Sequence, residues 1–392
     1  MPFDFSQAPD RSLTNSLKWT LYPPDVLPLW VADMDFPAPP AINEALARAV
    51  AHGVHGYEFP TKRLRKIMAA RMEKLYGWQV KPEWVIATPG IIAGFNAAAW
   101  AVCEPGQGIL TQPPVYPPFL SLHKNIGLTH QDAPLREVHE GKHLIRYEID
   151  FNQFEAAFDT DAPTRMFLLC NPHNPTGRAF NREELLKIAE TCLTHDTIIV
   201  SDEIHSELTL PPNRHIPIAA LDPEIAARTI TLIAPSKTFN IPGLFTGFAI
   251  IPDAELRRKF RHETERLCMH VNSLGLVAAE AAFSGACDEW LHELRIYLAA
   301  NRDFVTNFVR DNLPGARVTH PEATYLSWLD FRTLNLSPDP YQFLLKKAKV
   351  ALTDGKDFGQ GGQGFARLNF GCPRPILADA LGKIATIWPF QG

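Results

Sequence analysis

Cysteine is scarce in this chain of 392 residues, and the few cysteines are scattered. The six lie at positions 103, 170, 192, 268, 287 and 372, with no C-x-x-C pair among them. Disulfide frameworks and structural zinc sites need a more ordered cysteine spacing, so this pattern argues against both. We therefore expect free thiols in a reducing cytoplasm and no metal centre.

The sequence also lacks long hydrophobic runs and an excess of basic charge. No stretch approaches the roughly 18 consecutive apolar residues that cross a bilayer, and the N-terminus lacks the basic and then apolar order of a secretion signal. Lys and Arg number 38 against 43 Asp and Glu, which gives a formal net charge of −5. A chain with this balance has no general basic field, so we expect it to bind neither membranes nor nucleic acid.

What the sequence does have, from residue 84 onward, is short apolar runs that alternate with amphipathic stretches. The pattern predicts strands over residues 85–88, 108–111, 165–169, 197–201, 229–234 and 248–251. Short apolar strands separated by helices are typical of a parallel sheet that is covered on both faces. The sequence therefore predicts an α/β fold.

Helical spacing dominates other parts of the chain. Helices are predicted over 41–52, 61–76, 182–192 and 289–310, and the N-terminal residues before them are interpreted as an extended arm. The second of these helices carries six Lys or Arg and one Glu; we interpret it as a solvated basic face, with an anion-binding patch as the alternative. Alternating segments near the C-terminus, at 324–329, 341–349 and 366–369, predict a smaller α+β layer.

Two apparent motifs do not support a function. Residues 359–364 satisfy the spacing G-x-G-x-x-G, but the dinucleotide-binding motif needs a strand before it and a helix after it. Here a strand-like segment follows the glycines, so we interpret them as a mobile loop. Asp33 and Asp35 flank Met34 in an extended segment, and local polar interactions are favoured over a metal site.

Three polar side chains follow predicted strands, at a distance from one another in the sequence. Asn174 follows the strand over 165–169, Asp202 follows the strand over 197–201, and Lys237 follows the strand over 229–234. Because the carboxyl ends of parallel strands meet at one edge of a sheet and form a ligand crevice there, we expect an amide, an acid and an amine to converge.

This trio, with its neighbours, resembles the signature of the fold-type I pyridoxal phosphate enzymes of the class I/II aminotransferase superfamily. The resemblance implies that Lys237 bonds to the cofactor aldehyde, that Asp202 keeps the pyridine nitrogen protonated, and that Asn174 contacts the ring hydroxyl. It also implies a three-layer α/β/α large domain with a mainly parallel sheet over 49–287, and a smaller α+β domain formed by residues 1–48 and 288–392.

Other segments match the superfamily at the expected phosphate and ring positions. Residues 88–92, Thr-Pro-Gly-Ile-Ile, resemble a phosphate cup in which Gly90, Ile91 and Ile92 offer backbone N–H groups at a helix N-terminus. Ser236 resembles a further phosphate ligand. Tyr116 resembles the aromatic residue that stacks on the cofactor ring, with a purely structural core aromatic as the alternative.

Two more matches concern the partner subunit and the substrate. Tyr57 resembles the family tyrosine that reaches the phosphate of the neighbouring subunit, which implies a homodimer with shared sites. Arg367 matches the arginine that binds the substrate α-carboxylate with two hydrogen bonds, and Ala32 is assigned to the same substrate site. One departure is Phe245, where many aminotransferases have a phosphate-binding arginine.

Finer markers resemble the MalY/PatB group of carbon–sulfur lyases. They are the segments 30–36, 171–175, 202–205 and 234–240, and they include His205 in place of the usual tyrosine near the ring oxygen. The resemblance implies α,β-elimination on L-cystathionine or a related cysteine S-conjugate, with Lys237 as the base. The alternatives are aminotransfer and, as a minority view, a regulatory or binding protein that retains the fold. For His205 a structural role is an equal alternative.

Overall fold

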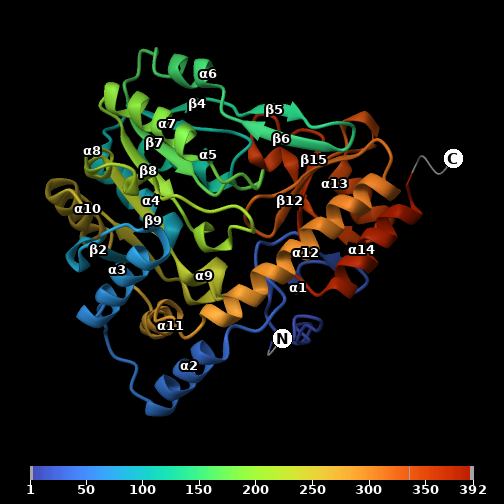
Figure 1. Cartoon of the computed structure of the whole chain (residues 1–392), viewed down its shortest axis with the longest axis horizontal. Helices are drawn as coiled ribbons and strands as arrows, with labels where there is room; N and C mark the ends of the chain where they lie inside the picture. The colour runs from blue at the N-terminus through green and yellow to red at the C-terminus, as the bar shows by residue number, and fades with distance from the viewer. Residues whose placement is uncertain (1–2, 335, 389–392) are drawn as a thin grey trace.

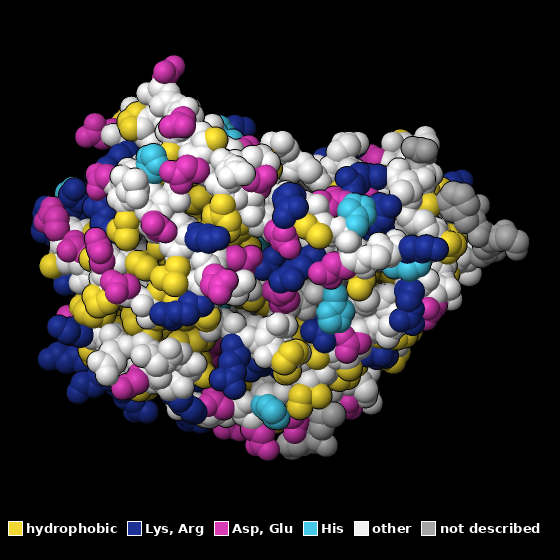
Figure 2. Space-filling view, turned by 45° about the horizontal axis from the view of Figure 1, so that its top comes forward, with side chains coloured by type: hydrophobic (Ala, Val, Ile, Leu, Met, Phe, Trp, Pro, Cys, Tyr) yellow, Lys and Arg dark blue, Asp and Glu magenta, His cyan; other side chains and the backbone are white. Residues whose placement is uncertain are grey.

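The computed structural model describes residues 3–334 and 336–388, which form two β-sheets with helices around them. In Figure 1 the larger sheet lies on the left and the smaller sheet on the right, and the long helix α12 (Asp288–Asn312) runs diagonally past both. Within the described residues no helix is both long and apolar enough to cross a membrane. Acidic and basic side chains are interspersed on the face drawn in Figure 2, so no field of one sign covers that face.

The larger sheet has the strand order β2-β10-β9-β8-β7-β3-β4. Its strands are β2 (Val85–Thr88), β3 (Gly108–Thr111), β4 (Thr129–Asp132), β7 (Thr164–Cys170), β8 (Ile198–Asp202), β9 (Thr229–Ile233) and β10 (Gly247–Ile250). All pairings are parallel except those of β10, which is antiparallel to both of its neighbours. As a result β2, β7, β8 and β9 all end at the same edge of the sheet.

Apolar side chains on both faces explain why this sheet forms the middle layer. Along β7, Met166 and Leu168 belong to a buried cluster with helix α4 (Ile91–Val102), whereas Phe167 and Leu169 belong to a second cluster with helix α7 (Arg182–Thr194). Alternate residues of a strand point to opposite faces, so a strand that is apolar throughout needs a cover on each side. The predicted three-layer α/β/α architecture is confirmed, and the six predicted strands are correct to within one residue at each end.

The remaining helices have the following bounds. They are α1 (Leu17–Thr20), α2 (Pro40–His52), α3 (Lys62–Tyr76), α5 (Pro117–Ile126), α6 (Phe151–Ala156), α8 (Pro223–Ala227), α9 (Pro235–Thr238), α10 (Ala254–Arg266), α11 (Ser273–Phe283), α13 (Pro340–Phe343) and α14 (Arg374–Thr386). Short 3-10 turns are η1 (Pro82–Trp84), η2 (Ser206–Leu208), η3 (Ile218–Ala220), η4 (Pro242–Leu244), η5 (Arg332–Leu334) and η7 (Gly355–Phe358).

The smaller sheet has the strand order β14-β15-β12-β11-β6-β5. Its strands are β5 (Arg136–His139), β6 (Leu144–Glu148), β11 (Arg317–Thr319), β12 (Leu326–Asp330), β14 (Thr353–Asp354) and β15 (Phe365–Asn369). The hairpin of β5 and β6 comes from inside the segment 49–287 and yet pairs with β11 of the C-terminal part. That predicted segment therefore does not supply the larger sheet alone, because the edge of β11 offers the hairpin a partner strand.

The N-terminal arm is largely extended, as predicted, and it is fixed to the C-terminal part of the chain. Strand β1 (Leu27–Pro28) pairs in parallel with β13 (Val350–Ala351). Phe5 is buried and contacts the rings of Phe36 and Trp290. The aromatic residues Trp290, Tyr297, Phe304 and Phe308 of α12 thus contribute to the core.

One C-terminal prediction needs correction, and another, a helix over 341–349 between two strands, is confirmed. Residues 359–364 are not a loose loop: the Gly362 N–H donates to the Gly359 carbonyl, and a Cβ on Gly362 would lie 1.9 Å from the Gly355 carbonyl oxygen. Close backbone packing, rather than mobility, explains these glycines. The segment 341–349 is helical, because α13 continues into a π-helical turn over Leu344–Ala348 (η6) that ends at Lys349 with φ of 58°.

The interpretation of α3 as a simple solvated basic face is wrong at Arg71. This side chain is buried and forms ion pairs with Glu207 and Asp288 at 2.5 and 2.9 Å. Its guanidinium also lies over the rings of Phe239 and Phe283, each 5.8 Å from the ring centroid. One of the six basic residues therefore ties α3 to the core beneath it.

We predict that Arg71→Met lowers the free energy of unfolding by about 3 kcal/mol, because it leaves the carboxylate of Glu207 buried without its cation. Urea unfolding followed by circular dichroism measures this loss. Arg258→Met is the matched control, since Arg258 pairs with Glu255 on the exposed face of α10 and should leave the unfolding curve unchanged. Equal effects of the two substitutions would contradict the assignment.

Candidate active site

The three polar residues that follow the predicted strands do meet at one edge of the larger sheet. Asp202 is the last residue of β8, Asn174 follows β7, and Lys237 lies in the short helix α9 directly after β9. Asn174 and Asp202 are buried, and the side chain of Lys237 is half-buried with its amine desolvated in the crevice. The charges of Asp202 and Lys237 affect each other's pKa. The predicted convergence of an amine, an acid and an amide is confirmed.

Lys237 has an amine that is ready to act as a nucleophile or a base. Its Nζ donates a hydrogen bond to the Ala32 carbonyl oxygen at 2.6 Å. Burial, together with the charge of Arg367, lowers the pKa of Lys237 to about 8, although the carboxylates of Asp33 and Asp202 oppose this change. A substantial fraction of the amine is therefore neutral near neutral pH, as a nucleophile or a general base requires.

Asp202 is a buried carboxyl group whose negative charge is stabilised by few neighbouring groups. Burial raises the pKa of Asp202 to about 7, and the neighbouring Glu203 adds to this effect. One hydrogen bond, from the Ile204 N–H to Oδ1 at 3.1 Å, favours the charged form, as does the amine of Lys237. A cationic ligand group beside Asp202 would remove most of this penalty.

Arg367 lies on β15 of the smaller sheet and reaches the same crevice. Its Nη1 donates to Asn174 Oδ1 at 3.0 Å, and its Nη2 donates to the Trp30 carbonyl at 3.0 Å. Burial lowers the pKa of Arg367 to about 10, and its Nε is buried without a hydrogen-bond partner. A guanidinium that is held by neutral acceptors only is suited to bind a carboxylate.

His205 and Tyr116 complete the inner surface. Burial and the charges of Lys237 and Arg367 lower the pKa of His205 to about 3, so its imidazole is neutral, and its Nδ1 has no hydrogen-bond partner. Burial and the charge of Asp202 raise the pKa of Tyr116. Tyr116 precedes α5 and packs edge-on against Phe119, so it belongs both to the site and to the apolar layer.

The predicted anion cup lies at the start of α4. Gly90 precedes the helix with φ of 106°, and no other atom lies within 4 Å of the position that a Cβ would occupy there. Ile91 and Ile92 form the first turn, whose N–H groups have no acceptor within the helix. Because β2 ends at the same edge as β9, this cup and Ser236 belong to the same crevice.

Tyr57 is the one predicted site residue that the single chain leaves outside. It lies in the segment between α2 and α3 and is 98% exposed. The described residues leave its ring almost uncovered, so its predicted role depends on another molecule.

Sequence reasoning missed three residues of the site. The Tyr325 hydroxyl donates to the Ala32 carbonyl at 2.8 Å, Asn240 bonds the backbone of Met34, and Asn369 bonds the carbonyls of Val31 and Asp33. Asn369 could have been found, because it lies two residues after Arg367 and alternate strand residues share a face. Nothing in the sequence around Tyr325 points to the site.

These features define a class of protein. A buried amine, an acid with a raised pKa, a neutral imidazole with an unpaired nitrogen and a helix N-terminus fit one ligand that combines an aldehyde, a protonated ring nitrogen and a phosphate. The unpaired Nε of Arg367 leaves room for a carboxylate beside it. The fold and site are therefore those of a fold-type I pyridoxal phosphate enzyme.

Comparison with known proteins agrees with this class. The sequence model of the family Aminotransferase class I and II matches residues 24–384, and the chain belongs to this family. It is 41% identical over 388 residues to the cystathionine beta-lyase PatB of Bacillus subtilis, which covers 97% of this chain and 98% of that protein. It is 30% identical over 391 residues to the protein MalY of Escherichia coli, with 97% and 98% covered.

A solved structure is similar over the same length. The crystal structure of cystalysin from Treponema denticola, which contains a pyridoxal 5'-phosphate cofactor, superimposes with a TM-score of 0.92 at 33% identity and covers 98% of each chain. The resemblance stated from the residues, to the class I/II superfamily and its MalY/PatB group, is thus confirmed.

The electrostatics of Asp202 predict an unusual stability profile for the ligand-free protein. The folded carboxyl keeps its proton up to about pH 7, whereas the unfolded one loses it at about pH 3.9. Between about pH 4 and pH 7 only the unfolded carboxyl ionises, so stability falls across this interval and stays low above it. Asp202→Asn should therefore raise the melting temperature at pH 8, and this gain should shrink through pH 5 and vanish below about pH 4. Calorimetric scans across this pH range measure it.

Asp330→Asn is the matched control. Burial alone would raise the pKa of Asp330, but hydrogen bonds from Arg332 outweigh it and lower that pKa. This substitution should therefore lower the melting temperature at pH 8. If both variants respond alike, the description of Asp202 is wrong.

Proposed function

We propose that this protein is a pyridoxal 5'-phosphate-dependent carbon–sulfur lyase. It cleaves L-cystathionine or a related cysteine S-conjugate by α,β-elimination and releases pyruvate, ammonia and a thiol. The observation that carries the proposal is the buried amine of Lys237 between Asp202 and Arg367, in a chain whose full-length relatives include cystathionine beta-lyases.

The residues that would hold the cofactor lie along the carboxyl edge of the larger sheet. Gly90, Ile91, Ile92 and Ser236 bind the phosphate, through backbone N–H groups and a hydroxyl. Asn174 and His205 face the ring oxygen, and Tyr116 covers the ring. Asp202 ionises beside the ring nitrogen and keeps it protonated. When bound, the cofactor supplies an electron-accepting ring that makes the Cα–H bond of the attached amino acid acidic.

The chain's own residues then bind the substrate and move its proton. Arg367 holds the α-carboxylate, for which its unpaired Nε is available, and the backbone at Ala32 lies beside it. Because the pKa of Lys237 is about 8, a fraction of the amine is neutral near pH 7 and can take the Cα proton at Nζ. The hydrogen bond to the Ala32 carbonyl fixes the direction of that amine. Loss of the sulfur substituent as a thiolate, which takes up a proton, completes the elimination. Water then hydrolyses the released aminoacrylate to pyruvate and ammonia.

The active unit is a homodimer in this proposal, with Tyr57 serving the phosphate of the neighbouring subunit. The exposed apolar side chains support it: Val54, Tyr57 and Phe59 are 70%, 98% and 76% exposed within eight residues of Gly53. A monomer gains nothing from such a patch, whereas a second copy would bury it.

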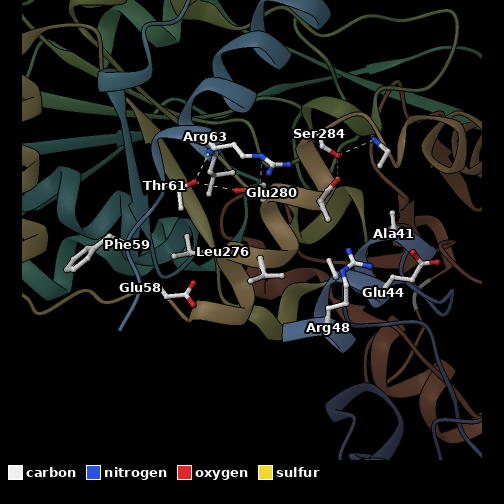
Figure 3. Close-up of a pocket in the computed structure, with 15 residues that line it drawn as sticks. Ala41, Glu44, Arg48, Glu58, Phe59, Thr61, Arg63, Leu276, Glu280 and Ser284 are labelled. Atoms are coloured by element: carbon white, nitrogen blue, oxygen red, sulfur yellow. Dashed lines mark hydrogen bonds and ion pairs between the residues drawn. The ribbon is translucent and has the colours of Figure 1, made fainter. Parts of the chain in front are cut away.

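A groove lies beside this patch, and the second subunit would also cover it. Its volume is about 500 Å³, and it is lined by α2, α3 and α11 together with the segment that carries Tyr57. Figure 3 shows Glu58 and Phe59 on one side of the groove and Glu44 and Arg48 on the other. The mixture of apolar and charged groups matches a subunit interface with a polar rim.

Three further expectations accompany the proposal. The larger domain comprises residues 49–287 apart from the β5–β6 hairpin, and the smaller one comprises residues 1–48 and 288–392. The protein acts in the cytoplasm, where reduced thiols persist. Its partners are a small amino-acid substrate and a second copy of itself, without a resident metal.

Product analysis tests the reaction. With L-cystathionine and no oxo-acid acceptor, we expect pyruvate, ammonia and a thiol in equal amounts, detected by coupled assay and thiol titration. Turnover that requires an oxo acid would instead indicate aminotransfer, and silence under both conditions would indicate a binding or regulatory protein. Lys237→Ala should abolish turnover and the visible absorbance of the purified protein, whereas Lys383→Ala, on the exposed side of α14, should leave both unchanged.

Subunit complementation tests the position of Tyr57. The Lys237→Ala homodimer should be inactive, and the Tyr57→Ala homodimer should be strongly impaired. A random mixture of the two chains should recover about a quarter of the wild-type activity, because half of the dimers are mixed and one of their two sites has both residues. No recovery, despite mixed dimers in native mass spectrometry, would place Tyr57 in the site of its own chain or in none.

A further inference from the structure

The segment from Trp30 to Phe36, which we call the strap, is fixed by side chains from both sheets. Its carbonyl groups accept hydrogen bonds along most of its length. The donors are Arg367 and Thr353 to Trp30, Asn369 to Val31 and Asp33, Lys237 and Tyr325 to Ala32, and Asn240 to Met34 and Phe36. The strap therefore carries the carbonyl oxygen that directs the amine of Lys237.

The acidic side chains of the strap are held by the N-terminal arm. Arg11 donates from Nη2 to Asp33 Oδ2 at 2.8 Å and from Nη1 to Asp35 Oδ1 at 3.0 Å. Lys18 pairs with Asp35 Oδ2 at 2.6 Å, and both of these side chains are fully buried. The expectation that Asp33 and Asp35 serve local polar interactions is confirmed, and their partners come from about twenty residues away in the chain.

The two carboxylates differ in how completely they are neutralised. Asp35 accepts hydrogen bonds from Arg11, Lys18 and the Trp19 indole, so its charge is fully compensated. Asp33 is bonded by Arg11 at Oδ2 only; its Oδ1 is buried without a hydrogen-bond partner and lies 3.6 Å from Lys18 Nζ. The remaining negative charge of Asp33 acts on Lys237, whose pKa it raises.

We propose that Arg11 and Asp33 are positioning residues of the lyase reaction: their ion pair aligns the strap and sets how strongly the protein field favours a proton on Lys237. The proposal rests on the proposed function for its kinetic consequence only. Lys18 and Asp35 are the buried anchor that lets this pair form in one geometry.

The field at Lys237 has few contributors, so the effect of Asp33 can be isolated. Burial and the guanidinium of Arg367 favour the neutral amine, and Asp202 and Asp33 favour the charged form. His205 and Tyr325 also face the site, and both are neutral because burial lowers the pKa of the imidazole and raises that of the phenol. Arg11 offsets the charge of Asp33 through a hydrogen-bonded ion pair at 2.8 Å, and Lys18 adds to this from 3.6 Å.

The test uses variants that change this field in opposite directions. In the holoenzyme, the visible absorbance of the link between Lys237 and the cofactor is titrated with pH. Asp33→Asn removes the negative charge and should lower the apparent pKa by roughly 0.5 to 1 unit, whereas Arg11→Met exposes that charge and should raise the pKa by a similar amount. Arg11→Lys keeps the charge and should restore the wild-type value.

Turnover is measured on the same samples. Asp33→Asn and Arg11→Met should each lower kcat by roughly tenfold with little change in KM, because the Ala32 carbonyl then orients the amine less well. If wild-type turnover of cysteine S-conjugates is absent but the opposite pKa shifts occur, the proposed reaction fails and the positioning role stands.

Arg317→Met is the control for a purely structural loss. Arg317 is as exposed as Arg11, at 25% against 23%, and it also pairs with a buried carboxylate, that of Asp330. This variant should lose stability without any change in the spectral pKa or in kcat.

Shifts of the spectral pKa in the same direction for Asp33→Asn and Arg11→Met, or no shift in either variant, would overturn the proposal. Should Arg11→Met fail to fold, the direction of the shift in Asp33→Asn and the recovery in Arg11→Lys decide.

Discussion

Three buried ionisable groups that do not pair with one another are the constraint on which this structure depends. Lys237 donates to a neutral carbonyl, Arg367 to an amide and a carbonyl, and Asp202 accepts from a backbone N–H. Throughout the described ranges none of the three forms an ion pair within 4.0 Å. Burial is accordingly the main cause of the pKa shift of each group, and it lowers stability by several kcal/mol before a ligand binds. The contrast with Arg71, which has two carboxylate partners, shows that this chain pairs its buried charges where nothing needs to bind.

The large apolar core makes this arrangement possible. The larger sheet is buried on both faces, so its strands are held in register, and the polar residues that follow β7, β8 and β9 arrive at the edge in fixed positions. A site built on strand ends keeps its geometry even when its charges repel or lack partners. Arg367 is held in the same way, within the smaller sheet, because β15 is paired with β12 on one side and β14 on the other.

The sequence predicted well whatever depends on local pattern. Apolar runs identified six of the seven strands of the larger sheet, and Asn174, Asp202 and Lys237 were found because each follows one of them. The strand over Thr129–Asp132 was missed because its residues are polar and partly exposed at the edge of the sheet. The β5–β6 hairpin was not predicted, and its pairing with β11 is a long-range choice of partner that composition does not encode. Tyr325 was missed for the same reason: its role depends on the Ala32 carbonyl, 293 residues away.

The strap shows why such long-range contacts matter for chemistry. Asn240, three residues after Lys237, forms hydrogen bonds with the backbone of Met34 in the strap. Asn369, two residues after Arg367, donates hydrogen bonds to the strap carbonyls of Val31 and Asp33. Lys237 and Arg367, which move the proton and bind the carboxylate in the proposed reaction, are therefore tied to the same short segment. A rotation of the smaller sheet against the larger one would break the hydrogen bonds of one asparagine to the strap or change the backbone conformation at Ala32. In the proposed reaction, a carboxylate bound to Arg367 is held beside the same segment whose Ala32 carbonyl accepts the hydrogen bond of Lys237 Nζ. Binding energy at the carboxylate is thereby converted into orientation at Cα.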